Sequence, residues 1–324
     1  MATAPEALGL DPALFRPEAI SEETRQANEQ LANLLASIPG LHEQEAAAAR
    51  KEREEGRGWQ GPVVTLDNGE DRSIPGPAGD IPLRVFVPET VNGVYLHLHG
   101  GGWTLGSHDQ QDVALWAVAQ AANVAVVSAG YRLAPEDPYP AGLDDCEAVA
   151  VWLAGSAANE FGSATLVIGG ESAGGHLSAV TLVRMRDRHG FTGFAGANLV
   201  YGAYDLSGTP SMAKGEDALL IPTAAVDAFL RQFLPAVDDR RAPDVSPLYA
   251  DLHDLPPALF TVGTLDPLLD DSLFMHQRWL AAGSESELAV YPGGTHGFNA
   301  LPTTIGAQAN ARQYEFIKRV VDSS

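Results

Sequence analysis

Two glycine-rich segments of this chain carry residue types suited to acyl transfer. The first is His99-Gly100-Gly101-Gly102-Trp103, whose backbone N–H groups can bind a developing oxyanion. The second is Gly170-Glu171-Ser172-Ala173-Gly174, which can hold a serine on a sharp turn. A Gly-x-Ser-x-Gly pattern alone is weak in a chain with 33 glycines, whereas His-Gly-Gly-Gly rarely occurs by chance. Together, and in this order, the two segments predict a serine nucleophile beside an oxyanion site.

Ser172 lies between an apolar stretch, residues 164–168, and a helical stretch that begins at Ala173. Gly170 and Gly174 remove side chains where a strand-to-helix turn is tight and backbones approach closely. The N–H of Ala173 would then point from the N-terminus of a helix toward the reacting carbonyl. The alternative is an ordinary turn whose serine is only hydrogen-bonded, and the His-Gly-Gly-Gly run argues against it.

A general base is expected downstream of the serine, and two histidines lie there. His276 falls within a helical pattern, residues 272–281, where a packing or surface role is expected. His296 follows a predicted strand in the flexible segment Pro-Gly-Gly-Thr-His-Gly, which suits a base that must reach Ser172. We therefore predict His296 as the base, with a purely structural loop histidine as the alternative.

An acid that orients the base is expected after the preceding strand. Asp266 has this place, and Pro267 suits the first turn of a following helix. A simple helix cap is the alternative for Asp266. Asp270 and Asp271 are rivals, but a position within the helix would direct them less well toward the base.

His97 and His99 stand two residues apart and admit a metal-binding interpretation. No third His, Cys or carboxylate cluster lies near them in sequence, so we predict neither a metal nor another cofactor. His99 is expected to brace the glycine loop by hydrogen bonding. The charged run of residues 43–55 is expected to be a solvated helix.

Strands and helices alternate from residue 94 onward, which predicts a parallel sheet covered by helices on both faces. The predicted strands are residues 94–99, 124–129, 164–168, 197–201, 258–263 and 288–291, with earlier strand-like segments at 63–66 and 83–87. The predicted helices are residues 110–121, 143–153, 173–188 and 223–233, with others after the last two strands. In such sheets ligands bind beyond the carboxyl ends of the strands, where the glycine run and Ser172 fall.

The alternation is interrupted in two places, which suggests a division of the chain. Residues 1–55 look helical and residues 205–240 form a polar insertion with prolines. We expect both to form a cap over the site, with residues 56–204 and 241–324 as the catalytic domain.

The composition excludes several classes of function. A net charge of −22 repels phosphate backbones and anionic membranes, so we expect no nucleic-acid partner and a neutral small-molecule substrate. No apolar stretch is long enough for a membrane span. The single cysteine, Cys146, excludes an internal disulfide, and we see no signal peptide, so a cytoplasmic location is expected. A homodimer is compatible with these features.

The chain resembles the hormone-sensitive-lipase-like branch of the α/β-hydrolases, the bacterial family IV carboxylesterases, over residues 60–324. The resemblance rests on the two glycine segments and on Tyr131-Arg132-Leu133-Ala134-Pro135-Glu136, Asp266-Pro267-Leu268 and His296-Gly297-Phe298, in family order. It implies an α/β-hydrolase fold, a mostly parallel central sheet flanked by helices, with a helical cap. The 131–136 segment is expected to be architectural, with a buried Arg132 that pairs with a carboxylate such as Glu136 or Asp144.

The resemblance implies that Ser172 is the nucleophile, His296 the base and Asp266 its partner. It also implies that the N–H groups of Gly101, Gly102 and Ala173 form the oxyanion hole. One departure is Glu171, where many members have Asp.

The predicted function is a serine carboxylesterase that acts on short- to medium-chain acyl esters through an acyl-enzyme. An amidase, lactonase or peptidase would use the same residues with another leaving group. A receptor similar to the plant gibberellin receptors is a third possibility, although those lack the working histidine that this chain has at His296.

Overall fold

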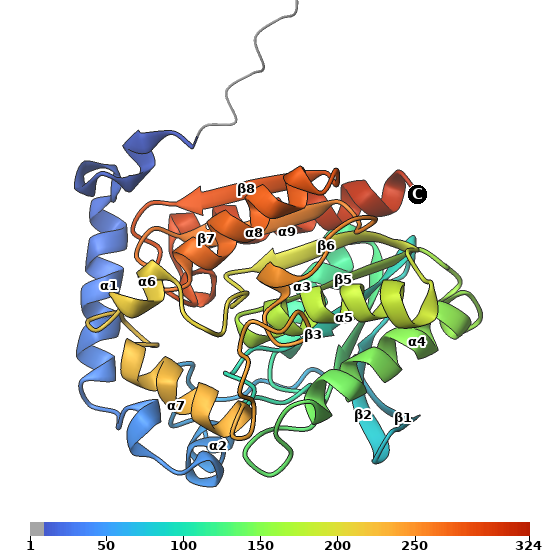
Figure 1. Cartoon of the computed structure of the whole chain (residues 1–324), viewed down its shortest axis with the longest axis horizontal. Coiled ribbons are helices and arrows are strands. Elements are labelled where there is room, and N and C mark those ends of the chain that lie inside the picture. Colours follow the sequence, from blue (N-terminus) through green and yellow to red (C-terminus); the bar gives the residue numbers. More distant parts are fainter. Residues whose placement is uncertain (1–9) are drawn as a thin grey trace, which may run out of the picture.

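The computed structural model describes residues 10–324, in which the strands form one eight-stranded sheet of order β1-β2-β4-β3-β5-β6-β7-β8 (Figure 1). Strands β3 to β8 pair in parallel, and β2 joins β4 antiparallel at one side. The strands are β1 (Glu70–Gly76), β2 (Gly79–Phe86), β3 (Gly93–Leu98), β4 (Val124–Ala129), β5 (Leu166–Glu171), β6 (Phe194–Val200), β7 (Ala258–Gly263) and β8 (Ser286–Tyr291).

Helices cover both faces of the sheet, so the central strands are buried on both sides and consist almost wholly of apolar residues. Helices α3 and α9 lie on one face, and α4, α5 and α8 lie on the other. The bounds are α1 (Glu22–Leu35), α2 (Ala46–Glu54), α3 (Asp112–Ala122), α4 (Ala141–Phe161), α5 (Ala173–His189), α6 (Pro210–Ala213), α7 (Thr223–Phe233), α8 (Leu269–Ala281) and α9 (Thr304–Asp322). Short 3-10 turns occur at Pro12–Phe15, Pro17–Ala19, Leu41–Glu43, Pro247–Tyr249 and Phe298–Ala300.

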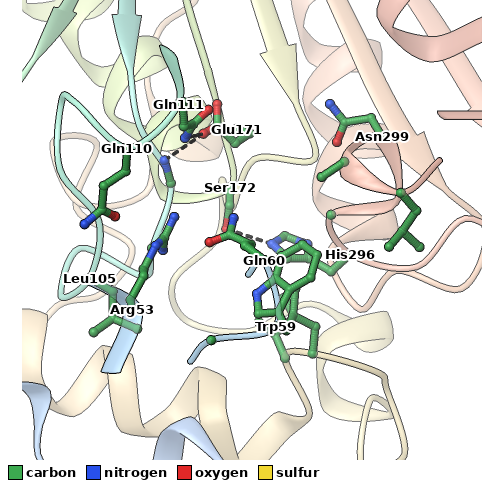
Figure 2. A pocket seen from close by; sticks show the side chains of 18 of the residues that line it. Arg53, Trp59, Gln60, Leu105, Gln110, Gln111, Glu171, Ser172, His296 and Asn299 are labelled. Carbon is green, nitrogen blue, oxygen red and sulfur yellow. Dashed lines mark hydrogen bonds between the residues drawn. The ribbon is translucent and has the colours of Figure 1, made fainter. Parts of the chain in front are cut away.

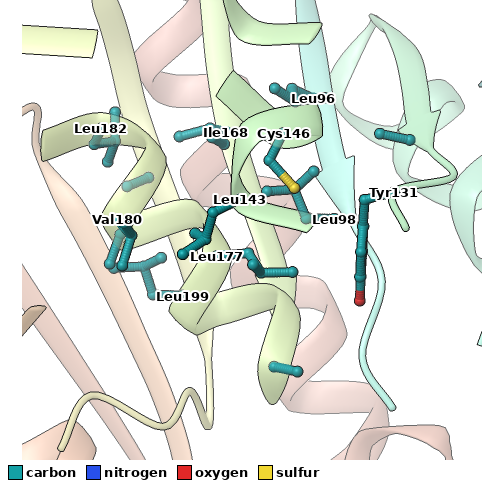
Figure 3. Close-up of a cluster of buried hydrophobic side chains, with 14 of the residues drawn as sticks. Leu96, Leu98, Tyr131, Leu143, Cys146, Ile168, Leu177, Val180, Leu182 and Leu199 are labelled. Carbon is teal, nitrogen blue, oxygen red and sulfur yellow. The ribbon is translucent and has the colours of Figure 1, made fainter. Parts of the chain in front are cut away.

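The larger part of the core lies between the sheet and helices α4 and α5. Figure 3 shows Leu96, Ile168 and Leu199 of three neighbouring strands against Leu143 and Leu177 of these two helices. All five side chains are fully buried. This packing fixes the ends of β3 and β5, from which the glycine run 99–103 and the turn at Ser172 emerge.

Near the start of the sheet one predicted strand was wrong and one observed strand was missed. Residues 63–66 form no strand, because Leu66 bonds to side chains instead: its N–H donates to Asp112 and its carbonyl accepts from Arg84. Strand β1 was not predicted, since its sequence Glu-Asp-Arg-Ser-Ile-Pro-Gly is polar and lacks the apolar pattern of a buried strand. It pairs antiparallel with β2 at the edge of the sheet, where such a sequence is tolerated.

Helices α1, α2, α6 and α7 gather at the left of Figure 1. Helix α1 is tied to the loop after β8 and to the start of α9, since Asn28 donates to the carbonyl of Gly293 and Glu23 accepts from the N–H of Thr304. The 3-10 turn Leu41–Glu43 packs beside α7. The N-terminal segment and the 205–240 segment are therefore in contact, and the predicted first cap segment includes residues 1–9, which lie outside the described residues.

Candidate active site

Ser172 occupies the turn between β5 and α5 with a backbone φ of 58° and ψ of −119°, a conformation that costs an L-residue free energy. Its N–H donates to the carbonyl of Val200 on the neighbouring strand, at 2.9 Å. A Cβ at Gly170 or Gly174 would lie 2.0 or 1.8 Å from the carbonyl oxygen of Leu98. Glycine is therefore required at both positions for the turn to pack against the end of β3.

Ser172, His296 and Asp266 form a continuous hydrogen-bonded chain, although they come from three separate loops. His296 Nε2 lies 2.8 Å from Ser172 Oγ, and His296 Nδ1 lies 2.9 Å from Asp266 Oδ2 (Figure 2 shows the first pair). Asp266 and His296 are 3% and 5% exposed, so water barely competes for these bonds. With its proton on Nδ1, His296 donates to Asp266 and accepts from the hydroxyl of Ser172.

Asp266 also accepts the N–H of Leu268, at 2.8 Å, ahead of α8. The capping role considered for it therefore coexists with its contact to the histidine. Pro267 precedes this helix and does not lie in its first turn, because α8 begins only at Leu269.

The rival residues serve other parts of the fold. The Nδ1 of His276 lies 2.7 Å from the hydroxyl of Ser286, which joins α8 to the start of β8. Asp270 accepts the N–H of Ser211, and Asp271 accepts two backbone N–H groups of the loop after β6. All three lie away from Ser172 because α8 directs them toward loops and β8.

The glycine run, residues 99–103, passes directly over Ser172. A Cβ at Gly100 would lie 3.4 Å from the Cβ of Ser172. Gly101 and Gly102 have positive φ values of 125° and 59°, and neither N–H bonds to another described residue. The N–H of Ala173 belongs to the first turn of α5, where backbone donors have no partner within the helix. Free donors thus lie on both sides of Ser172.

His99 braces this loop from behind, as the sequence predicted. Its ring stacks on Tyr131 with 4.3 Å between centroids, and its Nδ1 lies 2.9 Å from the carbonyl of Gly100. Burial lowers the pKa of His99 to about 3, so the ring is neutral and its Nδ1–H donates. The Tyr131 hydroxyl donates to the carbonyl of His99, at 2.6 Å.

Trp103 anchors the other end of the loop. Its indole stacks on Phe233 of α7 with 4.7 Å between centroids, and its Nε1–H donates to His176 Nδ1 at 3.0 Å. Burial lowers the pKa of His176 to about 4, so that nitrogen accepts as a neutral imidazole. The loop is thereby joined to α7 of the 205–240 segment and to α5.

Glu171 supports the loop through its side chain. It accepts from the N–H of Gly100 at 3.1 Å and from Gln111 at 2.5 Å, and one of its oxygens lies 3.1 Å from His97 Nε2. Burial opposes the charged carboxylate, but His97 and the two other donors outweigh it and lower the pKa of Glu171 to about 2. The longer side chain that departs from the family pattern thus finds three partners.

His97 is consequently part of a hydrogen-bond network, with Ser128 as its second partner at 3.0 Å. Among the described residues there is no group of three or more His, Cys, Asp or Glu placed to hold a metal ion. Neither Gln111 nor this role of His97 was predicted, because isolated residues outside any motif gave no signal.

Arg132 has a different carboxylate partner from those predicted. It forms a two-pronged bond with Asp145, at 2.8 and 2.9 Å, which pins the segment after β4 to α4. Asp144, one residue earlier, is rotated by about 100° around the helix and pairs with Arg184 of α5. Glu136 pairs with Arg50 of α2. The architectural role was predicted, but the partner and the burial of Arg132 were wrong, since its side chain is 28% exposed.

A cavity of about 1680 Å³ opens over Ser172 and His296. Its walls come from the glycine loop and from both segments expected to form the cap, with apolar side chains that include Leu31, Leu35, Trp59, Leu220, Val226 and Phe229. Figure 2 places Trp59 and Gln60 next to the serine and histidine. Sequence reasoning missed both, because the stretch after α2 has neither a motif nor a periodic pattern.

No helix in the described part of the chain is both long and apolar enough to cross a membrane.

Comparison with known proteins gives the same family from sequence and from structure. Residues 95–300 match a family model described as the alpha/beta hydrolase fold. The chain is 37% identical to carboxylesterase NlhH of Mycobacterium tuberculosis over 259 residues, which are 75% of this chain and 79% of that protein. It is 30% identical to an ethyl acetate hydrolase of Pseudomonas putida, with 82% and 86% covered.

A solved structure with a similar backbone is the hyperthermophilic esterase of Pyrobaculum calidifontis. It superposes with a TM-score of 0.83 at 29% identity, covering 96% of this chain and 98% of the esterase. The matched segment contains the glycine loop, the serine turn, Asp266 and His296. The chain therefore belongs to the α/β-hydrolase fold family, in its hormone-sensitive-lipase-like branch.

Proposed function

We propose that this chain is a serine carboxylesterase in which Ser172 attacks the ester carbonyl. The observation that carries the proposal is the chain Ser172–His296–Asp266, with distances of 2.8 and 2.9 Å, beside free N–H groups at the base of a cavity. A serine hydroxyl needs an adjacent base to become nucleophilic, and the tetrahedral intermediate needs donors for its oxyanion. The site offers both.

The proposed reaction runs in two halves. As Ser172 Oγ bonds to the carbonyl carbon, His296 Nε2 takes its proton, and Asp266 stabilises the imidazolium. The N–H groups of Gly101, Gly102 and Ala173 receive the oxyanion. His296 then protonates the departing alcohol and leaves an acyl-Ser172. Water, deprotonated by His296, then attacks the acyl carbon. The bond from that carbon to Ser172 Oγ breaks, His296 returns the proton to Oγ, and the acid is released.

Neutral esters with short to medium acyl chains are the proposed basic substrates. The cavity walls carry apolar side chains that suit such acyl groups, and the net charge of −22 disfavours polyanions at long range. Residues 1–55 and 205–240 form the proposed cap that limits acyl length. The contact between the Leu41–Glu43 turn and α7 supports one joint cap.

Two further proposals concern the protein in its surroundings. A cytoplasmic location is supported by the single buried thiol, Cys146, which no disulfide within the chain can use. A homodimer is compatible with the sequence, and light scattering on the purified protein tests this state.

The test combines a substrate screen with a covalent trap. We expect hydrolysis of p-nitrophenyl esters that peaks at short to medium chains, with much slower cleavage of the matching anilides. A fluorophosphonate is expected to modify a single peptide, with the label on Ser172. Faster cleavage of anilides would favour an amidase. A tight ligand without turnover would favour a receptor, which the bond between His296 and Ser172 opposes.

Ser172→Ala provides the matching variant. We predict a loss of kcat of about 10⁴-fold or more with an unchanged circular dichroism spectrum, since the nucleophile is removed and the packing stays. Near-complete retention of activity would exclude Ser172 as the nucleophile.

A further inference from the structure

Arg53 of α2 lines the same cavity and has no place in the reaction described above. In Figure 2 its side chain rises toward the part of the pocket that holds Gln110, Gln111 and Glu171. His296 lies on the other side of Ser172 in that view. A guanidinium is therefore present in the pocket on the side away from the base.

The neighbouring arginines of this segment are paired, and Arg53 is not. Arg50 forms a two-pronged ion pair with Glu136, at 3.0 and 2.8 Å, and Arg57 binds Glu52. Arg53 has no hydrogen bond or ion pair from its side chain to any residue in the described range 10–324. The chain has 42 acidic and only 20 basic side chains, so carboxylates that could pair with Arg53 outnumber the basic groups. The free guanidinium is thus a specific property of the pocket.

The surroundings of Arg53 disfavour an unpaired charge. Burial lowers the pKa of Arg53 below its ordinary value, while the charge of Glu171 works in the opposite direction. An arginine stays protonated at neutral pH in spite of such a shift. Glu171 is no direct partner, because its oxygens accept from Gly100 and Gln111 and contact His97. A partly desolvated cation with five free donors is poised to bind an anion from outside the chain.

The chemistry at Ser172 decides which part of an ester reaches Arg53. The leaving alcohol must lie next to His296 Nε2, since this nitrogen protonates it. The acyl part then extends to the opposite side of the serine, where Arg53 lies. Gln110 lines the same side of the cavity, and its amide NH₂ group can donate to a carboxylate there. This end of the acyl pocket is suited to a polar, charged terminus.

We propose that Arg53 binds a carboxylate at the far end of the acyl group, so that half-esters of dicarboxylic acids are a further class of substrate. The inference rests on the proposed esterase function and concerns its acyl selectivity. The net charge of −22 acts over the outer surface, whereas Arg53 acts within contact distance inside the pocket, where its attraction is screened less. Neutral esters remain substrates, and a terminal carboxylate adds binding energy.

The experiment compares pairs of esters that differ only in this charge. Monoethyl succinate, glutarate and adipate are each paired with the neutral ester in which a terminal carboxamide replaces the carboxylate. Hydrolysis is followed by titration at constant pH. We expect the wild type to prefer one of the charged esters by about tenfold or more in kcat/KM, as a charge-assisted bond predicts. The preferred length reports the distance from Ser172 to Arg53.

Arg53→Met removes the charge and keeps much of the side-chain length. It is expected to lower kcat/KM for the preferred charged ester by about 10- to 100-fold, mainly through KM, and to change the carboxamide ester less than about threefold. Arg53→Lys should restore part of the preference, since an ammonium lacks the two-pronged geometry. The control is Lys51→Met, which removes a charge from the exposed side of the same helix and should alter neither ester.

Two results would overturn the proposal: no charge preference at any length in the wild type, or an equal loss for both esters in Arg53→Met. The second would mean that Arg53 acts on Glu171. If Arg53→Met does not fold, inhibition of the wild type by glutaramate, which keeps one carboxylate, and by the neutral diamide of glutaric acid decides, and only stronger inhibition by glutaramate agrees with the proposal. If no ester is cleaved and Ser172 is not labelled, the esterase function itself fails.

Discussion

Gly101 and Gly102 are adjacent in the glycine loop, but a side chain at each position would meet a different kind of neighbour. A Cβ at Gly101 would lie 2.2 Å from the backbone carbonyl oxygen of Leu105, which cannot move without the loop. A Cβ at Gly102 would lie 2.4 Å from the ring of Phe229, a side chain of α7. The clash at Gly101 is with backbone and cannot be relieved by a substitution. The clash at Gly102 is with the side chain of Phe229, which a substitution can shorten.

We predict that Gly101→Ala and Gly102→Ala each lower kcat by about 10²-fold or more, since displaced N–H donors no longer meet the oxyanion. Adding Phe229→Ala should recover part of the activity of Gly102→Ala. The remaining deficit reflects the positive φ of 59°.

The same second substitution should not help Gly101→Ala. Steady-state kinetics of the two double variants therefore test the geometry of the loop. Equal recovery in both, or in neither, would contradict it.

The shifted pKa of Glu171 makes the free energy of unfolding depend on pH. Its pKa is about 2 in the folded protein against an ordinary 4.5, so its charged form favours folding. This contribution is complete above about pH 4.5 and is lost as the pH falls from there toward 2.

We predict that Glu171→Gln is less stable than the wild type at pH 7. The difference should shrink as the pH falls below 4.5, by up to about 1.4 kcal/mol per pH unit. Urea midpoints between pH 7 and 3 measure it, and parallel curves for the two proteins would contradict the assignment.

The residues of the proposed catalytic chain, Ser172, Asp266 and His296, could be selected from the sequence because each stands in a loop directly after a strand, in the chain order serine, acid, histidine. Ser172 also carried a motif, and the place of His296 after a strand distinguished it from His276. The partner of Arg132 was not predictable, because choosing Asp145 over Asp144 depends on how α4 is rotated against the sheet. Arg53 was hidden in a charged helix that resembles any solvated surface helix.

At the level of elements, α7 contacts the glycine loop through the side chain of Phe233. This side chain is 2% exposed and stacks on Trp103 with an interplanar angle of 6°. Its own carbonyl accepts the N–H of Tyr139. A helix of the 205–240 segment thus determines the position of a catalytic loop that lies far away in sequence.

We predict that Phe233→Ala lowers the free energy of unfolding by about 3–5 kcal/mol and also lowers kcat, because Trp103 directly follows Gly102. The control is Phe161→Ala at the end of α4, where the ring is buried against Trp152. It should cost comparable stability and leave kcat unchanged. Equal kcat in both variants would show that α7 does not position the loop.

The buried helices and strands followed from the apolar pattern, and residues 223–233 and 258–263 were predicted with the bounds observed. Strand β1 escaped because an edge strand needs no apolar alternation. The helices around the site were expected. Their contact with the loop after β8 depends on single hydrogen bonds, such as that of Asn28 to Gly293, and no sequence pattern predicts such a bond.

At the level of the whole molecule, the N-terminal segment closes one side of the cavity. Leu31 of α1 is buried and lines it. We predict that deletion of residues 1–40 shifts the preference among p-nitrophenyl esters toward longer acyl chains, because a wall of the pocket is removed.

Leu31→Ala should shift it in the same direction by less, in an otherwise intact chain. Phe15→Ala, whose side chain is 39% exposed outside the cavity, is the control. An unchanged profile in folded variants would argue against a cap at this place.

The backbone conformation of Ser172 serves the proposed reaction but lowers the free energy of unfolding. Its φ of 58° stores roughly 1–3 kcal/mol, which the packed glycines around it hold in place. A glycine at this position would adopt the same φ at little cost in free energy. The protein would then be more stable, but it would lack the hydroxyl that attacks the ester.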